Sequence, residues 1–391
     1  MFVSLKAYAE LYDRSGDTVR RLAEQGRLTT AKKVGRNWVV DSNEPYPTRQ
    51  HKFTVASLFS GCGGMDLGFL GGFDFLGRKY SENPFEIVWA NEINKKACET
   101  YARNISPDIV CGDIANEIDT LPEHVDVVIG GFPCQDISVN GKMLGIEGER
   151  SSLYTWIVEA VRRTEPLAFV AENVGGLMLK KHDKSRQKIL SDFDSLGYSI
   201  NFHLYNASDY GVPQTRERVF IVGTRRGCDF HVPEKITEGN PVTAFEAIGD
   251  LETMEENREF SHIWSRAKAS GEQGNRHLEA NRPGYTIRAE CHGNTQFHYC
   301  LPRRISMREE ARIQSFPDSF LFSCGIRETE RQLGNAVPPV LAWHVARALA
   351  AALYGGTNEK RDVRGAFKGR LCPFNSGNAP EEFGDTQVEC V

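Results

Sequence analysis

A strand, a helix and a second strand between residues 127 and 176 constrain the fold most. Val127–Ile129 and Leu167–Ala171 are apolar runs that end at glycine or polar residues, as strands buried on both faces do. Ser151–Arg163 lies between them, has apolar residues at helical spacing and ends in two arginines. This order predicts parallel, neighbouring strands. We therefore predict an α/β fold around a largely parallel sheet.

Both predicted strands lead into residues that can carry chemistry. Gly130–Cys134 follows the first strand, and Glu172 follows the second, 38 positions after Cys134. The carboxyl ends of parallel strands share one edge of a sheet, where ligands of open α/β folds bind, so we expect the thiol and the carboxyl to lie there together. Pro133 fixes its own φ and gives the thiol a defined direction. An ordinary buried cysteine is the alternative, and this stretch alone leaves both interpretations open.

A thiol beside a carboxyl suits addition to cytosine. A thiolate that adds at C6 turns C5 into an enamine carbon, which can attack a methyl sulfonium. A carboxyl at N3 and a cation at O2 make C6 more electrophilic. Arginines for this role occur in Val212–Gly223, where strand alternation would send Gln214, Arg216 and Arg218 to one face. The alternative for these side chains is a solvated strand face.

Five ordered segments resemble the motifs of DNA cytosine-5 methyltransferases. They are Phe59–Gly64, Gly131–Gln135, Glu172–Val174, Gln214–Arg218 and Gly334–Pro339. The resemblance covers residues 53–354 and implies a Rossmann-like S-adenosylmethionine-dependent methyltransferase fold with a smaller target-recognition domain. It implies S-adenosylmethionine as cofactor, double-stranded DNA as partner, Cys134 as nucleophile and Glu172 as the contact to N3. It also implies that Arg216 and Arg218 stabilise a flipped base.

The predicted cofactor site begins after the strand Thr54–Leu58. The glycine turn there lacks the third glycine of a dinucleotide fingerprint, and Asp66 would repel a pyrophosphate. A cationic sulfonium amino acid fits this turn better, in agreement with the resemblance. The residues predicted to bind the cofactor are Phe59, Gly61, Cys62, Gly63, Gly64, Glu92, Ile93, Asp113, Ile114, Pro133, Asn335 and Val337.

Two acids in that set follow further strands. Glu92 comes after the strand Ile87–Ala90 and can accept hydrogen bonds from ribose hydroxyls. Asp113 is placed to accept the adenine amino group, with Ile114 packing on the base. Taken singly, each acid could be an ordinary loop residue. We interpret Gly71–Phe85 as a loop insertion before the second strand.

Two regions are predicted to contact DNA. Asp136–Gly148 is polar and glycine-rich, so we expect a mobile lid that closes over an extruded base, the alternative being a loop without DNA contact. The sequence after Thr224, through about Leu301, is rich in Arg, Asn, Gln and His, and Thr286–Ile287 resembles a short recognition element. Cys291–Cys300 matches no common zinc spacing, so no metal site is predicted. The predicted DNA-binding residues are Gln135, Ser138, Asn140, Lys142, Arg276 and Arg288.

Residues 1–50 are predicted to form a separate module. Two short helices, Ser4–Leu11 and Asp17–Gln25, precede a basic hairpin at Lys32–Val40, an arrangement similar to the winged helix-turn-helix of excisionase-like and MerR-like DNA binders. Ten Lys and Arg face six Asp and Glu through residue 52, whereas the whole chain carries −5. This local positive charge favours DNA docking, promoter DNA included. A stabilising or dimerising appendage is the alternative.

The predicted organisation has five parts. They are the winged module 1–50, the catalytic domain 51–228, the target-recognition domain 229–329, a returning helix 330–356 and a flexible tail 357–391. No signal peptide or long uncharged apolar run is evident, so we expect a cytoplasmic protein without a membrane partner. Ten cysteines without disulfide spacing fit a reducing compartment.

These features together predict a DNA cytosine-5 methyltransferase that serves as the modification enzyme of a restriction-modification system. A tRNA-modifying enzyme would share the motifs, but the winged module and the sizeable recognition region favour DNA. A promoter-binding repressor with an incidental methylase fold is the alternative from another class. It predicts that Cys134→Ser leaves all function intact.

Overall fold

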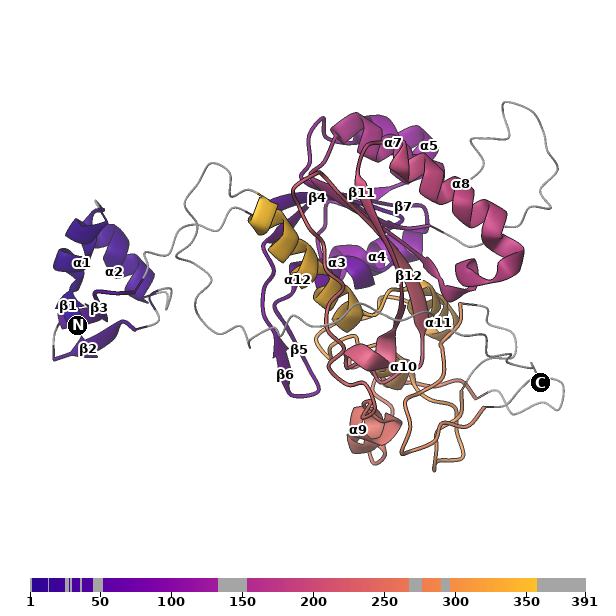
Figure 1. The fold of residues 1–391 in the computed structure, drawn as a ribbon. Helices are drawn as coiled ribbons and strands as arrows, with labels where there is room; N and C mark the ends of the chain where they lie inside the picture. Colours follow the sequence, from indigo (N-terminus) through magenta and orange to yellow (C-terminus); the bar gives the residue numbers. More distant parts are fainter. Residues whose placement is uncertain are drawn as a thin grey trace. The chain divides into compact units, whose positions relative to one another are not determined.

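The computed structural model divides the chain into two compact units, residues 1–50 with 358–391 and residues 51–357. The structure describes residues 2–12, 14–24, 28, 30–35, 37–44, 52–132, 153–266, 276–289 and 296–356 (Figure 1). Several predicted residues lie outside these ranges, together with the expected lid 136–148 and tail 357–391; they are Pro133, Cys134, Gln135, Ser138, Asn140 and Lys142.

A seven-stranded sheet, in the order β11-β12-β10-β9-β4-β7-β8, forms the centre of the larger unit. The strands are β4 Phe53–Leu58, β7 Phe85–Glu92, β8 Val110–Cys111, β9 Val127–Gly131, β10 Ala168–Val174, β11 Ser199–Asn206 and β12 Glu217–Thr224. The five strands from β8 to β10 are parallel, and β12 is antiparallel to both of its neighbours. The chain order reverses between β4 and β9, the point at which open α/β sheets bind ligands.

The predicted strand–helix–strand unit is confirmed. β9 and β10 pair in parallel and are connected through α7, which spans Tyr154–Thr164. Alternate side chains of β9 enter different cores: Val127 and Ile129 face one hydrophobic cluster, and Val128 faces another. Burial on both faces explains why this strand is continuously apolar.

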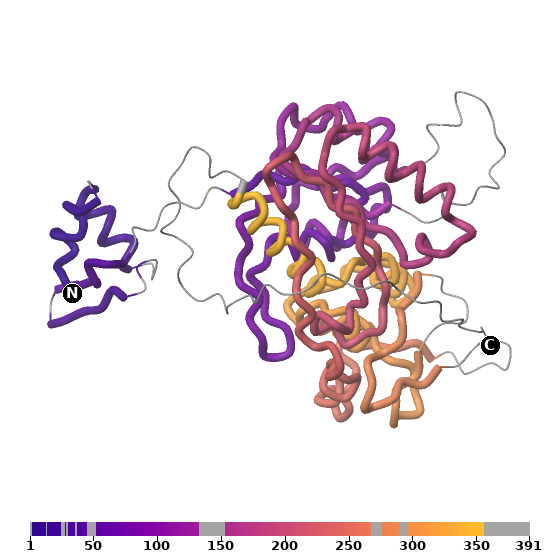
Figure 2. Tube along the Cα trace, viewed as in Figure 1, coloured from indigo at the N-terminus to yellow at the C-terminus, as the bar shows by residue number. Residues whose placement is uncertain are grey.

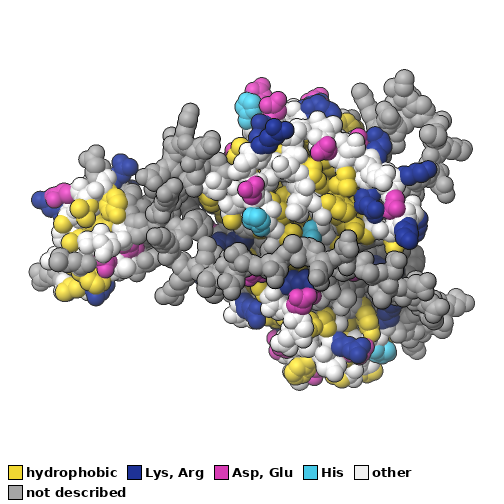
Figure 3. Space-filling view, in the orientation of Figure 1, with side chains coloured by type: hydrophobic (Ala, Val, Ile, Leu, Met, Phe, Trp, Pro, Cys, Tyr) yellow, Lys and Arg dark blue, Asp and Glu magenta, His cyan; other side chains and the backbone are white. Residues whose placement is uncertain are grey.

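Helices cover both faces of the sheet (Figure 1). The α-helices of the larger unit include α3 Gly64–Leu70, α4 Lys95–Asn104, α5 Ile114–Glu117, α7 Tyr154–Thr164, α8 Asp183–Asp194, α9 Ala244–Ile248, α10 Met307–Ile313, α11 Ile326–Asn335 and α12 Pro339–Gly356. Short 3-10 helices are η1 Ile118–Thr120, η4 Gly175–Met178, η5 Lys180–His182, η6 Ala207–Tyr210 and η7 Gly249–Leu251. Lys and Arg side chains gather over α8 on the face seen in Figure 3.

The last helix returns to the first strand of the unit, as Figure 2 shows. The rings of Phe53 in β4 and Tyr354 in α12 lie 5.2 Å apart. A Cβ at Gly68 would lie 2.4 Å from the Cβ of Ala342, so a glycine is needed where α3 and α12 cross. The run Ile326–Gly355 is long and apolar enough to cross a membrane, but 67% of its apolar window is buried. Packing in the core therefore explains its apolar character.

The expected loop insertion at Gly71–Phe85 is instead a β-hairpin. β5 Phe73–Phe75 pairs with β6 Arg78–Tyr80 across Leu76 and Gly77, which both have positive φ. Phe73 and Tyr80 stack with ring centres 5.1 Å apart, and both are buried. The prediction failed because a leucine occupies a turn position at which Asn, Asp or Gly is the usual signal.

The smaller unit has a three-stranded antiparallel sheet in the order β1-β3-β2. Its elements are β1 Phe2–Ser4, α1 Leu5–Leu11, α2 Gly16–Glu24, β2 Lys32–Val34 and β3 Asn37–Asp41. Ser4 caps α1 by accepting a hydrogen bond from the Ala7 amide at 3.2 Å. Tyr8, Val19 and Val40 are fully buried. The two expected helices and the hairpin are therefore confirmed, whereas β1 was not expected.

Between β12 and α11 the described chain has little regular structure. α9, α10 and the irregular segments around them share a hydrophobic cluster that includes Ile248, Ile287, Ile313 and Phe316. The predicted division into 51–228, 229–329 and 330–356 stays a prediction, since residues 51–357 form one compact unit.

Candidate active site

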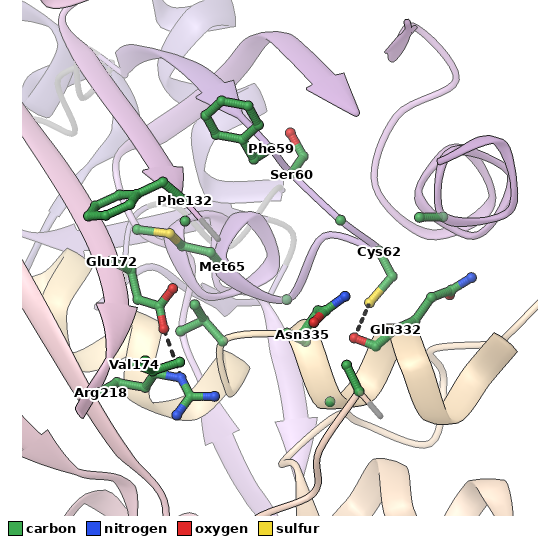
Figure 4. A pocket seen from close by; sticks show the side chains of 18 of the residues that line it. Phe59, Ser60, Cys62, Met65, Phe132, Glu172, Val174, Arg218, Gln332 and Asn335 are labelled. Carbon is green, nitrogen blue, oxygen red and sulfur yellow. Dashed lines mark hydrogen bonds and ion pairs between the residues drawn. The ribbon is translucent and has the colours of Figure 1, made fainter. Parts of the chain in front are cut away.

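A cleft of about 980 Å³ opens at the carboxyl ends of β4, β9 and β10, where the chain order reverses. Leu58, Gly131 and Glu172 contribute from these strand ends. The far wall comes from α11 and the residues after it, among them Asn335 (Figure 4). The segment 286–289 closes part of the same cleft. The sheet therefore brings together motifs that are far apart in the sequence.

Glu172 and Arg218 form a buried ion pair in this cleft, pointing toward one another in Figure 4. The Nε of Arg218 lies 2.8 Å from Oε1 of Glu172, and the side chains are only 9% and 8% exposed. β10 and β12 run antiparallel, which sets Arg218 opposite Val174 and near Glu172. Burial raises the pKa of Glu172, and the charges of Arg218 and Arg216 lower it in part. The net effect is that the pKa of Glu172 lies above that of an ordinary exposed glutamate.

Hydrogen bonds connect the backbone that leads to Cys134 with the strand that carries Glu172. Gly131 is the parallel-sheet partner of Glu172, and a Cβ at Gly131 would lie 2.9 Å from Oε2 of Glu172. The Phe132 amide donates to the Glu172 carbonyl at 3.3 Å, and Nδ2 of Asn173 donates to the Phe132 carbonyl at 2.9 Å. Phe132 is the last described residue before Cys134, whose thiol lies outside the described residues.

Arg216 does not share the position of Arg218, contrary to the expectation that both lie on one strand face. β12 begins only at Glu217, and Arg216 is fully buried before it. Its guanidinium donates to the carbonyls of Ile287 at 2.8 Å, Gly334 at 2.7 Å and Ala336 at 3.0 Å. Burial and the nearby Arg218 lower its pKa well below the usual value. Arg216 holds the backbone of the cleft wall and does not line the cleft in the described residues.

Gln214 and Arg216 both hydrogen-bond the backbone of Ile287. Its Oε1 accepts from the Ile287 amide at 3.0 Å, while Arg216 donates to the Ile287 carbonyl. The Thr286 hydroxyl donates to the Thr215 carbonyl at 2.7 Å. Gly334 must be a glycine, because a Cβ there would lie 2.1 Å from the Ala289 nitrogen. Thr286–Ile287 is therefore clamped beside the cleft.

The glycine turn after β4 has the backbone conformation that its sequence predicts. Phe59, Gly61 and Gly63 have φ angles of 55°, 56° and 94°. A Cβ at Gly63 would lie 2.7 Å from Cγ1 of Ile105, and one at Gly64 would lie 2.4 Å from the Val337 carbonyl oxygen. Glycine therefore lets the turn pack tightly between α4 and the segment after α11.

Glu92 organises the turn from the end of β7. Its carboxylate accepts from the Gly61 amide at 2.9 Å and from the Asn94 amide at 2.8 Å. Burial raises its pKa, and these amides lower it in part. The adjacent Ile93 is 66% exposed and lines the cleft, so it offers an apolar surface beside a carboxylate. Two ribose hydroxyls and a base fit such a pair of surfaces.

Asp66, which is expected from the sequence to repel a pyrophosphate, is a residue of the cleft. It is fully buried and lines the cleft from α3. Its Oδ1 accepts from the Tyr101 hydroxyl at 2.9 Å, whereas Oδ2 has no hydrogen-bond partner among the described residues. Burial raises the pKa of Asp66 to about 6, although the Ser57 and Tyr101 hydroxyls act in the opposite direction. A buried acid in this position favours a cationic ligand.

Most of the described cofactor candidates meet in the cleft. Those that line it are Phe59, Gly61, Cys62, Gly64, Glu92, Ile93, Asn335 and Val337. Gly63 lies in the same turn without lining it, and Asp113 and Ile114 are absent from the described lining. Oδ1 of Asp113 caps α5 by accepting from the Ala115 amide at 3.0 Å, and Ile114 is buried in a core cluster. Their contacts to adenine stay predictions.

The structure separates the two described candidates for DNA contact. Arg288 is exposed and lines the cleft, whereas Arg276 lies over the Tyr285 ring, 5.5 Å from its centre, and does not. Three cleft residues on α11 were not predicted; they are Glu328, Arg331 and Gln332. Their position directly before the Gly334–Pro339 motif was the available signal.

Comparison with known proteins decides the family. The model of the family "C-5 cytosine-specific DNA methylase" matches residues 53–351. The chain belongs to this family. The methylase is 38% identical to the type II methyltransferase M.NgoFVII of Neisseria gonorrhoeae, with 80% of this chain and 90% of that protein covered. It is 35% identical to M.BbvI of Brevibacillus brevis, with 80% and 95% covered.

Solved structures support the methylase fold. A putative DNA modification methyltransferase encoded within a prophage (E. coli) matches with a TM-score of 0.55 and 24% identity, covering 79% of this chain and all of that chain. A Spodoptera frugiperda DNMT2 variant matches with a TM-score of 0.56 and 16% identity, covering 76% and 99%. These structural likenesses concern the fold alone.

The methylase transfers a methyl group from S-adenosylmethionine to C5 of cytosine in DNA. The described cleft fits this cofactor. Glu92 can hold ribose hydroxyls, Ile93 can cover an adenine, and the buried carboxyl of Asp66 favours a cationic amino acid. The cofactor supplies an electrophilic methyl group when bound.

Proposed function

We propose that Cys134 attacks C6 of a cytosine that has rotated out of double-stranded DNA. The observation that carries this proposal is the buried pair of Glu172 and Arg218 directly beside Phe132. Cys134 is two positions after Phe132 in the sequence, and two extended residues span at most about 7 Å. A Cys134 thiolate is therefore within reach of a base that Glu172 and Arg218 hold.

Glu172 and Arg218 have complementary roles in this proposal. The Glu172 carboxyl, whose pKa burial raises, hydrogen-bonds N3 and shares a proton there as Cys134 forms a bond to C6. Arg218 keeps Glu172 oriented through its Nε and places its guanidinium charge beside O2 of the ring. C5 then carries the electron pair that accepts the methyl group. Loss of the C5 proton and release of Cys134 restore the aromatic ring.

Arg216 and Gln214 act as positioning residues in the proposal. They fix both backbone groups of Ile287 and, through Gly334 and Ala336, the segment that precedes Val337. The wall predicted to meet DNA and the wall predicted to meet the cofactor are thus connected through one buried guanidinium. In this proposal Arg216 contributes to catalysis by holding the Ile287 segment and the Gly334–Ala336 segment in a fixed relative position.

Trapping with 5-fluorocytosine tests the covalent step. Bisulfite sequencing of DNA from cells that express the methylase first identifies its target. A duplex with 5-fluorocytosine at that target should then give a covalent complex in the presence of S-adenosylmethionine, because fluorine cannot leave as the proton does. Cys134→Ser should give none. Active methylation without any trapped complex would contradict the proposal.

We also propose a biological setting for the reaction. The similar type II methyltransferases support a role as the modification enzyme of a restriction-modification system, in the cytoplasm, with residues 229–329 as target-recognition domain. Tritium from labelled S-adenosylmethionine should enter duplex DNA and not tRNA. Equal labelling of tRNA would favour the tRNA-modifying alternative.

The smaller unit is proposed to be a winged helix-turn-helix that docks on DNA, promoter DNA included. Arg20 and Arg21 are exposed on α2, and Lys32 and Lys33 are exposed on β2. In the full chain, the double variant Arg20→Glu with Arg21→Glu should weaken DNA binding and leave the oligomeric state in solution unchanged. Lys6→Glu on α1 is the matched control. An altered oligomeric state with unchanged DNA binding would instead favour dimerisation.

A further inference from the structure

An exposed basic segment directly follows the cleft and has no role in the reaction described above. It comprises Met178, Leu179, Lys180, Lys181 and Lys184, and we call it the lysine ridge. All five side chains are exposed, with Met178 and Leu179 at 41% and 53%. The ridge therefore offers two apolar side chains next to three positive charges on one exposed turn.

The ridge is continuous with the active site. η4 starts at Gly175 and ends at Met178. Gly175 and Gly176 line the cleft beside Glu172, and the ridge follows within a few residues. Anything that enters the cleft from a long duplex therefore passes near these side chains.

Neighbouring charges leave the three ridge lysines unpaired. Arg186 pairs with Asp183 at 2.7 Å, and Lys188 pairs with Asp192 at 3.3 Å. In the described part of the chain, Lys180, Lys181 and Lys184 form no ion pair. Dark-blue side chains over α8 in Figure 3 mark this side of the unit as locally basic. This concentration contrasts with a whole-chain charge of −5.

The ridge also has a fixed backbone. Nη1 of Arg186 donates to the carbonyls of Leu177 and Met178, both at 3.2 Å. Leu177 is fully buried beneath the turn. The lysines therefore project from a supported turn, which lowers the entropy that a bound partner must remove.

We propose that the lysine ridge binds the sugar–phosphate backbone of the DNA that flanks the target cytosine. The lysines would neutralise phosphates, and Met178 and Leu179 would contact apolar deoxyribose surfaces between them. This proposal rests on the proposed entry of a flipped cytosine into the cleft. Phosphate contacts of this kind set position and affinity and carry no sequence information.

Salt-dependent DNA binding tests the ridge. Lys180→Gln with Lys181→Gln removes two charges from an exposed turn, and Arg78→Gln with Lys79→Gln removes two exposed charges from the hairpin β5–β6. The ridge variant should lower the slope of log Kd against log salt by about 1.8, since each phosphate contact contributes about 0.9. At about 0.1 M salt its Kd should rise about tenfold or more, equally for target and non-target duplexes. The hairpin variant should behave as wild type.

Two further measurements separate the outcomes. S-adenosylmethionine affinity, measured by calorimetry, should be equal in all three proteins. A duplex trimmed to the target and its immediate neighbours should abolish the difference between the ridge variant and wild type. Equal slopes for the two variants, or a difference that persists on the trimmed duplex, would overturn the ridge. Failure of wild type to bind and methylate any duplex would instead overturn the function on which the ridge rests.

Discussion

The edge of the sheet and the wall opposite it use arginine in contrasting ways. At the edge, β10 and β12 supply regular backbone pairing, and Arg218 pairs with Glu172 while it also donates to the Glu217 carbonyl at 2.7 Å. In the opposite wall of the cleft, where the backbone is irregular, Arg216 donates hydrogen bonds to three backbone carbonyls. Arg308 does the same for Phe260, Pro317 and Phe320.

This difference follows from where each backbone finds its hydrogen bonds. A strand in a ladder is satisfied by its neighbours, so its side chains are free for chemistry. An irregular buried segment has no ladder, and a side chain with several donors must serve it. Variants at the edge should therefore change the reaction, whereas variants in the wall should change stability.

Glu172→Gln should give the largest effect. Glutamine keeps the shape but cannot share a proton with N3, so the single-turnover rate should fall by about 10² to 10⁴. Because burial raises the pKa of Glu172, wild-type activity should decline as pH rises above that pKa, and the variant should lack this limb. Its unfolding temperature should stay close to that of wild type.

Glu217→Gln is the matched control for this change. Glu217 is exposed and lines the same cleft, one residue before Arg218. It should retain the wild-type rate and pH profile. Equal losses in the two variants would show that general cleft charge matters and that the position of Glu172 does not.

Arg216→Met should give the next largest effect, on stability. The change leaves the carbonyls of Ile287, Gly334 and Ala336 without this donor in a buried site. The free energy of unfolding should fall by about 3 kcal/mol, measured by urea denaturation. Arg218→Met should lower the rate more than the stability. If Arg216→Met is as stable as wild type and merely inactive, the contrast between edge and wall is wrong.

The same contrast explains what the sequence could predict. β9, β10 and the convergence of Gly131 with Glu172 follow from apolar periodicity and parallel topology, which are local patterns. The burial of Arg216 does not, because alternation in Gln214–Arg218 is the same whether a strand starts at Gln214 or at Glu217. Only the tertiary contacts to Ile287 and Gly334 decide it. The burial of Asp66 could not be predicted for a similar reason, since its partner Tyr101 is 35 residues away.

Asp66→Asn should change how the free energy of unfolding depends on pH. Burial raises the pKa of Asp66 from 3.8 to about 6, so the folded state binds the proton more tightly than the unfolded state. Stability from this group is present below about pH 4 and is lost as pH rises through 6, by at most about 3 kcal/mol. The variant should therefore gain stability relative to wild type between pH 4 and 7. Denaturant titrations at both pH values measure this difference.

Asp74→Asn serves as the control, because Asp74 is exposed on β5. It should show the same pH dependence as wild type. A parallel pH dependence in Asp66→Asn and wild type would mean that folding does not raise the pKa of Asp66. The proposed preference of the cleft for a cation would then lose its support.

The smallest effect should come from Thr243→Ala, which probes how the wall unfolds. Oγ1 of Thr243 accepts from the Glu246 amide at 3.2 Å, and Glu246 accepts in return from the Thr243 amide at 2.8 Å, which caps α9. Its loss should lower the free energy of unfolding by about 1 kcal/mol, and Thr243→Ser should restore it. Because α9 packs into the cluster that Phe316 shares, calorimetry should show one transition shifted as a whole. A second transition that alone moves would instead favour an independent target-recognition domain.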